Sequence, residues 1–171
     1  LLGLPNSGKT TLLKRLTGAR VSASEYPFAT KSPRLGTYRT HLSEVRIAEL
    51  PAVYGASTRG GGLGTRFLKH LERAKIIFLM LTPETDFAPS LKAGMSILTD
   101  TIRNFNSSFL SLPRVWVVNK VDLVPKKSVT LNVFPPGEKV FPISALTGEG
   151  LNPLMEDAIR FLQERRACAN V

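Results

Sequence analysis

Gly3-Leu4-Pro5-Asn6-Ser7-Gly8-Lys9-Thr10 stands near the start of the 171-residue chain and decides the fold. It fits the pattern G-x-x-x-x-G-K-[ST], whose glycines let consecutive backbone N–H groups curl round a phosphate at the N-terminus of the next helix. In this pattern the lysine bridges β- and γ-phosphates, and the threonine hydroxyl binds Mg²⁺. We therefore expect a nucleotide site with Lys9 in a catalytic role, Thr10 on the metal, and a binding set formed by Asn6, Ser7, Gly8, Lys9, Thr10 and Thr11.

The apolar pattern around this loop predicts an α/β fold, in which a mostly parallel sheet carries helices on both faces. Only Leu1 and Leu2 precede the loop, so we expect a truncated first strand and further sequence before it. Residues 1–166 are expected to form one domain, followed by a tail at 167–171. Helices are expected at residues 11–18, 65–74, 91–105 and 152–166, strands at 76–81, 114–118 and 139–143, a hairpin at 38–50, and an irregular stretch at 20–36.

Base identity depends on Asn119-Lys120-Val121-Asp122, which follows the apolar run RVWVV. A carboxylate at Asp122 can accept hydrogen bonds from N1–H and the exocyclic amine of guanine, whereas adenine would leave it desolvated and unpaired. Asn119 can bond the base edge and brace the phosphate loop, and the stem of Lys120 can cover the ring. Three further residues are expected to donate backbone N–H groups to guanine O6, with a helix-capping serine as the alternative: Ser144, Ala145 and Leu146.

Charge is the most informative feature of the composition. The 23 basic and 13 acidic residues give a net charge of +10, and residues 1–85 hold 13 of the basic and 5 of the acidic residues. This excess indicates a polyanionic partner, most plausibly nucleic acid, although a generally basic, solvated surface is the alternative. The single cysteine, Cys168, excludes an internal disulfide, and we expect no membrane span.

Together these motifs resemble the translational class of GTPases, and the middle of the chain narrows the resemblance to the Obg family. Residues 26–30 (YPFAT) and 32–36 (SPRLG) are similar to that family's first switch. Residues 55–57 (GAS), 60–64 (GGGLG) and 67–73 (FLKHLER) are similar to its second switch and the helix after it. The resemblance spans nearly the whole chain.

The resemblance implies a three-layer P-loop GTPase fold, with GTP or GDP and Mg²⁺ as cofactors. It also implies a role in assembling the large ribosomal subunit, with rRNA and ribosomal proteins as partners, and a glycine-rich domain before Leu1. Thr30 would be a catalytic and metal-binding residue of the first switch, with an ordinary polar loop residue as the alternative. His70 matches a family position but is assigned no catalytic role.

The chain departs from the family where Asp-x-Pro-Gly is expected, because it has Glu49-Leu50-Pro51-Ala52. Glu49, the expected metal residue, is one methylene longer than aspartate. Ala52, at a position with a catalytic role, restricts positive φ and adds a methyl group beside the phosphate. Val53 stands where other GTPases place a water-orienting glutamine. These changes predict weakened GTP hydrolysis.

Three readings of the function remain open at this stage. The first is a ribosome-assembly GTPase with impaired hydrolysis, and the second is an rRNA-binding scaffold that keeps nucleotide as a structural ligand. A P-loop ATPase or kinase unrelated to translation is the third. The basic, divergent sequence favours the mitochondrial matrix over a bacterial cytoplasm or plastid, and the sequence that precedes Leu1 would test this.

Overall fold

The computed structural model describes residues 1–18, 33–41, 43–53, 67–83, 86–125 and 131–169. Its strands are β1 (Leu2–Gly3), β2 (Arg34–Arg39), β3 (Glu44–Glu49), β4 (Ile77–Leu81), β5 (Arg114–Val118) and β6 (Val140–Pro142). Its α-helices are α1 (Lys9–Thr17), α3 (Leu91–Asn106) and α4 (Leu151–Ala169). Short 3₁₀ helices are η2 (Phe67–Arg73), η3 (Ser107–Ser111), η4 (Val121–Leu123) and η6 (Leu131–Val133).

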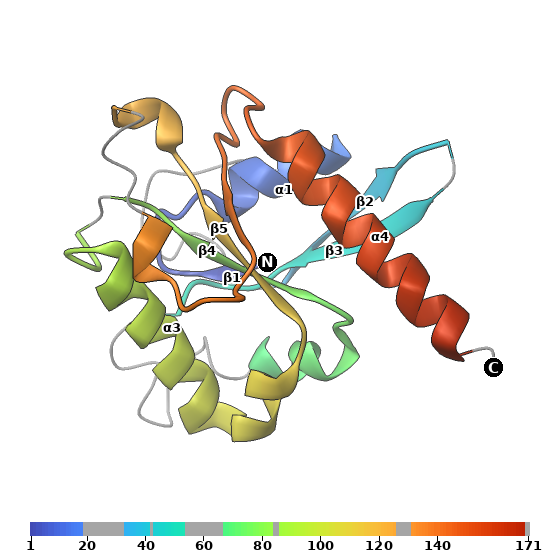
Figure 1. The fold of residues 1–171 in the computed structure, drawn as a ribbon, viewed down its shortest axis with the longest axis horizontal. Coiled ribbons are helices and arrows are strands. Elements are labelled where there is room, and N and C mark those ends of the chain that lie inside the picture. Colours follow the sequence, from blue (N-terminus) through green and yellow to red (C-terminus); the bar gives the residue numbers. More distant parts are fainter. Residues whose placement is uncertain (19–32, 42, 54–66, 84–85, 126–130, 170–171) are drawn as a thin grey trace.

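Four strands form a parallel sheet in the order β1-β4-β5-β6, and β2 and β3 form an antiparallel hairpin. The hairpin leads directly to the β1 edge of the sheet. Leu50 N donates to Leu1 O at 3.0 Å, and Val53 N donates to Gly3 O at 3.4 Å. Residues after β3 therefore run beside β1 and beside the start of the phosphate loop, with the strands arranged as in Figure 1.

The sheet separates two apolar cores, as expected for strands buried on both faces. In β4, Leu79 and Leu81 face the core under α3, while Phe78 and Met80 face the core under α1 and α4. Trp116 and Val118 of β5 follow the first pattern, and Val115 and Val117 follow the second. The prediction of a three-layer α/β fold is therefore confirmed, with α3 and α4 on opposite sides of the strands in Figure 1.

Several element boundaries differ from those expected. Strand β2 begins at Arg34, inside the stretch expected to be irregular, because Pro33 precedes the strand and does not interrupt it. Segment 65–74 was expected to be an α-helix, and its described part forms the 3₁₀ helix η2. Helix α1 begins at Lys9, and α4 continues to Ala169 with Cys168 exposed on it. Strand β6 ends at Pro142; proline has no N–H to donate, and an edge strand tolerates this because one of its sides need not pair.

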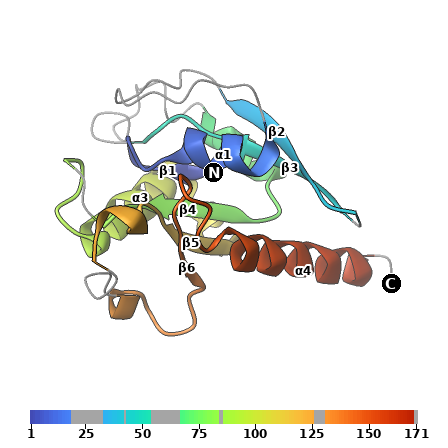
Figure 2. The same cartoon turned by 90° about the horizontal axis from the view of Figure 1, so that it is seen from above.

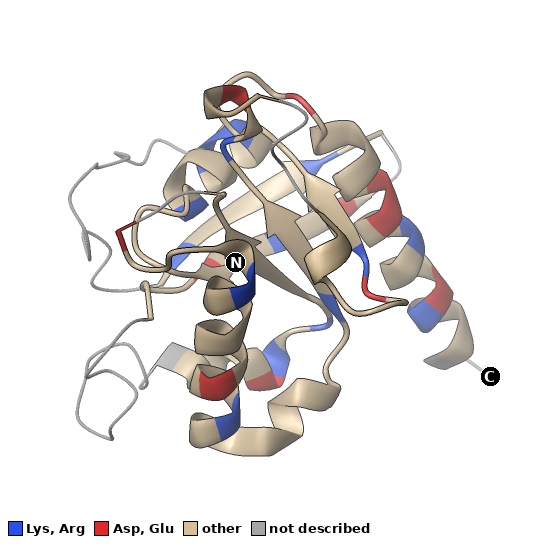
Figure 3. Cartoon of the chain, turned by 60° about the vertical axis from the view of Figure 1, so that its left-hand side comes forward, with Lys and Arg blue, Asp and Glu red and all other residues tan. Residues whose placement is uncertain are grey.

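Charged side chains are unevenly placed on these elements. Helix α1 carries Lys9, Lys14 and Arg15 and no acidic residue, whereas basic and acidic positions alternate along α4 (Figure 3). In Figure 2 the β2–β3 hairpin and α4 extend toward the same end of the molecule, and Gln163 Nε2 donates to Ser43 Oγ at 3.3 Å between them. Among the described residues, no helix is long and apolar enough to cross a membrane.

Candidate nucleotide site

The phosphate loop ends at Gly8, whose φ of 84° and ψ of 22° lie in the left-handed region. Glycine adopts this conformation without strain, and here it turns the chain sharply into α1. No side chain caps the first turn of α1, and no acidic residue lies in that turn. In α3, by contrast, the side chain of Ser90 accepts a hydrogen bond from Ala93 N. The N–H groups at the start of α1 are thus directed at the loop, as an anion site requires.

Asn119 joins the phosphate loop to the last loop of the sheet. Its Nδ2 donates to Ser7 O at 2.9 Å, and its Oδ1 accepts from Ala145 N at 2.9 Å. The side chain is 2% exposed, so both hydrogen bonds are shielded from water. Gly8 lies against the same amide, because a Cβ at that position would stand 2.2 Å from Asn119 Nδ2. The Asn119 bridge therefore holds together three segments that are far apart in sequence.

Lys9 is folded back across the loop. Its ammonium donates to Leu4 O at 2.8 Å and to Gly3 O at 3.1 Å, and the residue is 5% exposed. Burial lowers the pKa of Lys9 to about 8, and the nearby carboxylate of Glu49 opposes that shift. The carbonyls of the loop thus hold the Lys9 ammonium, whose charged form is destabilised by burial. The negative charge of a bound phosphate would stabilise that charged form.

Ser7 and Thr11 complete the phosphate loop. The Ser7 hydroxyl donates to Leu4 O at 2.8 Å, so its side chain braces the turn. Asn6 has a positive φ of 58° and is half-buried, and Thr11 is half-buried in the first turn of α1. The structure therefore brings the expected loop residues together, with Ser7 oriented inward.

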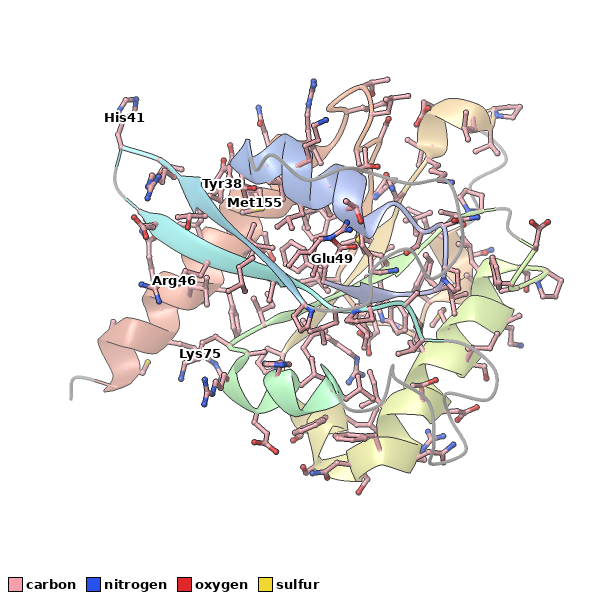
Figure 4. All side chains as sticks on the ribbon, turned by 180° about the vertical axis from the view of Figure 1, so that it is seen from behind. Tyr38, His41, Arg46, Glu49, Lys75 and Met155 are labelled. Atoms are coloured by element: carbon pink, nitrogen blue, oxygen red, sulfur yellow. The ribbon has the colours of Figure 1, made fainter. Side chains whose placement is uncertain are left out.

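Thr10 and Glu49 meet at the point where β3 reaches α1. The Thr10 hydroxyl donates to Glu49 Oε1 at 2.5 Å, and Glu49 is 1% exposed. Figure 4 shows Glu49 beneath α1 at the inner end of the hairpin, while His41 lies at its outer tip. The sequence did not indicate Arg34, whose Nη1 lies 3.3 Å from Thr10 Oγ1 and 3.9 Å from Glu49 Oε2.

Two of the expected metal residues, Thr10 and Glu49, supply oxygen atoms of the kind that Mg²⁺ prefers. The fit is incomplete, however, because the guanidinium of Arg34 lies against both of them. The third expected metal residue, Thr30, lies outside the described residues, as do residues 26–30 and 54–66 of the two switches.

After β5, where the base of the nucleotide is expected to bind, Lys120 turns the chain with a φ of 66°, and Val121 N donates to Ile143 O at 3.2 Å. Asp122 follows on η4 and is exposed, as a residue that meets a ligand must be. Residues 145–147 form a turn, and Ser144 Oγ, just before it, accepts from Thr147 N at 3.0 Å. Ser144 thus caps this turn, which lies before α4, and Leu146 is 70% exposed within it.

Ala52 and Val53 follow Glu49 on the segment beside β1. Val53 is fully buried in the core under α3, which also contains Leu4 of the phosphate loop. Ala52 is 9% exposed. His70 is exposed on η2. In this arrangement Val53 has a packing role.

A phosphate loop after β1, and an Asn119 bridge and an exposed Asp122 after β5, lie at the carboxyl ends of strands in one parallel sheet. Together they define a P-loop GTPase domain. The sequence matches the 50S ribosome-binding GTPase family over residues 1–120, and the chain belongs to this family.

Proteins similar to the chain include Obg GTPases. GTPase Obg of Chloroherpeton thalassium is 36% identical over 166 residues, which is 96% of this chain and 49% of the relative. GTPase Obg of Oleidesulfovibrio alaskensis is 35% identical over 170 residues, covering 96% of this chain and 46% of the relative. The predicted resemblance to Obg proteins is therefore confirmed. The chain spans about half the length of these relatives.

Solved structures agree on the fold. Aquifex aeolicus Era bound to GDP·AlF₄⁻ has a TM-score of 0.74 at 26% identity, with 94% of this chain and 55% of that chain covered. Era in complex with MgGDPNP and nucleotides 1506–1542 of 16S ribosomal RNA has a TM-score of 0.73 at 26% identity, with 94% and 54% covered. NFeoB of S. thermophilus, at 21% identity and a TM-score of 0.73, shares the fold, with 94% of this chain and 60% of that chain covered.

Proposed function

We propose that this domain binds guanine nucleotide, with the phosphates on the N-terminus of α1 and the base beside Asp122. The observation that carries the proposal is the Asn119 bridge, which ties the phosphate loop to the loop of Ala145. A base bound there would meet the exposed carboxylate of Asp122 on one edge and the stem of Lys120 on its face. Similar structures of Era contain GDP·AlF₄⁻ and MgGDPNP, which supports the proposal.

Nucleotide competition tests the base preference. Fluorescent GDP should bind the purified domain and be displaced by GDP or GTP, while ADP and ATP should displace it at least about 100-fold less well, because adenine leaves Asp122 unpaired. Lys9→Met should abolish binding, and Lys14→Met, on the exposed face of the same helix, serves as the matched control. Equal displacement by ADP would favour an ATPase unrelated to translation instead.

We further propose that GTP is hydrolysed slowly. Glu49 already holds the Thr10 hydroxyl, Ala52 replaces the glycine of the second switch, and Val53 is buried in the core. Single-turnover hydrolysis by Glu49→Asp/Ala52→Gly should exceed that of the unmodified domain at least about 10-fold, the lower range for a positioned catalytic group. Equal rates would refute this explanation.

The contact of Glu49 with Thr10 and Arg34 also favours a second candidate, a scaffold in which nucleotide is a structural ligand. The two candidates differ in one measurement. A GTPase should show hydrolysis stimulated by large-subunit particles, and a scaffold should show stabilisation by GDP and GTP alike with no stimulated hydrolysis.

We propose the precursor of the large ribosomal subunit, with its rRNA and proteins, as the partner. The family description, the Obg relatives and the +10 net charge support this proposal. The full-length protein should co-sediment with large-subunit precursors and be released as salt rises, because phosphate contacts weaken with ionic strength. Co-sedimentation with the small subunit only would refute it. We also propose a mitochondrial location, which imaging of the full-length protein in the plastid or cytoplasm would refute.

A further inference from the structure

Arg34 occupies a defined position at the inner end of the β2–β3 hairpin. It is the first residue of β2 and lies directly opposite Glu49, the last residue of β3. Its Nη1 lies 3.3 Å from the hydroxyl oxygen of Thr10 and 3.9 Å from Glu49 Oε2. The side chain of Arg34 is 26% exposed, whereas that of Glu49 is 1% exposed. One guanidinium therefore faces both the start of α1 and a buried carboxylate.

These two partners, Thr10 and Glu49, correspond to the residues that hold Mg²⁺ in P-loop GTPases, namely the threonine of the phosphate loop and the Walker-B acidic residue. A buried carboxylate is stable only beside a positive charge. The Arg34 guanidinium supplies such a charge permanently, because arginine does not lose its proton in proteins. Lys9 also interacts electrostatically with Glu49, and together these cations surround the carboxylate.

A divalent cation and this guanidinium would compete for one place. Mg²⁺ binds oxygen at about 2.0–2.1 Å, so an ion on Thr10 Oγ1 would lie close to Arg34 Nη1, which is 3.3 Å from the same oxygen. An Mg²⁺ ion and a guanidinium that both lie this close to the Thr10 hydroxyl oxygen repel each other strongly in a partly buried site. An arginine is also a good donor to phosphate oxygen, through paired N–H groups.

We infer that Arg34 supplies the positive charge beside Thr10 and Glu49 that Mg²⁺ supplies in other sites of this class. Nucleotide binding by this domain therefore depends only weakly on Mg²⁺. The inference rests on the proposed guanine-nucleotide binding and deepens it, because it assigns the residue that replaces the divalent ion in holding the nucleotide.

The test is titration of fluorescent GDP in excess Mg²⁺ and in excess EDTA. The unmodified domain should lose less than about 3-fold in affinity when Mg²⁺ is removed. Arg34→Met should bind on the order of 10- to 100-fold more weakly in EDTA, which is the usual effect of one hydrogen bond to a charged group, and should recover with Mg²⁺. Arg34→Lys keeps the charge and should behave more like the unmodified domain.

Arg39→Met is the matched control, because Arg39 lies on the same strand, is exposed, and pairs with Glu44 at 3.2 Å. Circular dichroism and urea unfolding show whether each variant is folded. The inference is overturned if the unmodified domain and Arg34→Met respond identically to EDTA, or if the unmodified domain alone requires Mg²⁺. Absence of GDP binding by the folded, unmodified domain under both conditions would overturn the proposed function as well.

Discussion

Neutralising Lys9 should change how the stability of the nucleotide-free domain depends on pH. Burial lowers the pKa of Lys9 from 10.5 to about 8 in the folded protein. Between these two values the unfolded chain binds the proton and the folded domain does not, so the free energy of unfolding rises with pH. The cost of keeping Lys9 charged is fully present below pH 8 and disappears above about 10.5.

The pKa difference corresponds to about 3 kcal/mol in total, at about 1.4 kcal/mol per unit. Between pH 7.5 and 9.5 the expected gain in the free energy of unfolding is about 2 kcal/mol. Urea unfolding monitored by circular dichroism would show it as a midpoint that rises by about 1 M, for a typical dependence of 2 kcal/mol per molar. Lys9→Met has no ionisable group at this position, so its midpoint should lack that rise.

Any other group that changes protonation over this range contributes to both proteins alike, and subtracting the Lys9→Met curve removes that contribution. Lys14→Met, which alters an exposed lysine of the same helix, should retain the full rise. Saturating GDP should abolish it in the unmodified domain, because phosphate oxygens raise the pKa of Lys9 again. Parallel curves for the unmodified domain and Lys9→Met would refute the reasoning.

Three further predictions concern the bridge and the base site. Gly8→Ala should lower the free energy of unfolding by more than Gly137→Ala. Both glycines have positive φ values (84° and 88°), but only at Gly8 would an added Cβ stand against Asn119. Equal losses of about 1–2 kcal/mol would show that backbone strain alone lowers the stability. Asn119→Ala should cost about 2–4 kcal/mol in urea unfolding, because two buried backbone groups lose their partner. Asn106→Ala, at an exposed site where Oδ1 accepts from the N–H and the hydroxyl of Ser108, should cost about 1 kcal/mol or less; equal costs would contradict the importance of burial. Asp122→Asn should weaken GDP binding at least about 10-fold and shift the preference of the site toward the xanthine nucleotide. The reason is that an amide can donate to the carbonyl which xanthine has in place of the guanine amine. Unchanged competition by the xanthine nucleotide would exclude Asp122 from the base site.

The sequence predicted those parts of the site in which a local pattern determines the geometry. A glycine-flanked loop before α1 must turn sharply into the helix, and a buried strand must end before Asn119, so both positions could be assigned. The pairing of Asn119 with Ser7 and Ala145 could be anticipated only as a brace, because its partners depend on how neighbouring strands are ordered. The structure supplied that order.

Arg34 was missed for a different reason. The prolines at 27 and 33 indicated an irregular segment, and the expected hairpin began at residue 38. Thr40 N donates to Ser43 O at 2.8 Å, and the register of this hairpin places Arg34 opposite Glu49, so that pairing was the available signal. The packing role of Val53 could not be predicted either. It depends on two tertiary contacts, the hydrogen bond from Val53 N to Gly3 O and the packing of the side chain in the core under α3.

The long span of the Asn119 bridge has a consequence for synthesis of the chain. Ser7 and Asn119 are 112 residues apart, and Asn119 reaches Ala145 a further 26 residues on. A contact between such distant residues forms late, since the intervening chain must first be ordered. During translation the phosphate loop leaves the ribosome before its amide partner, and the far loop leaves later still. A nascent chain thus acquires its nucleotide pocket only when the sheet is almost complete, which couples ligand capture to the end of folding.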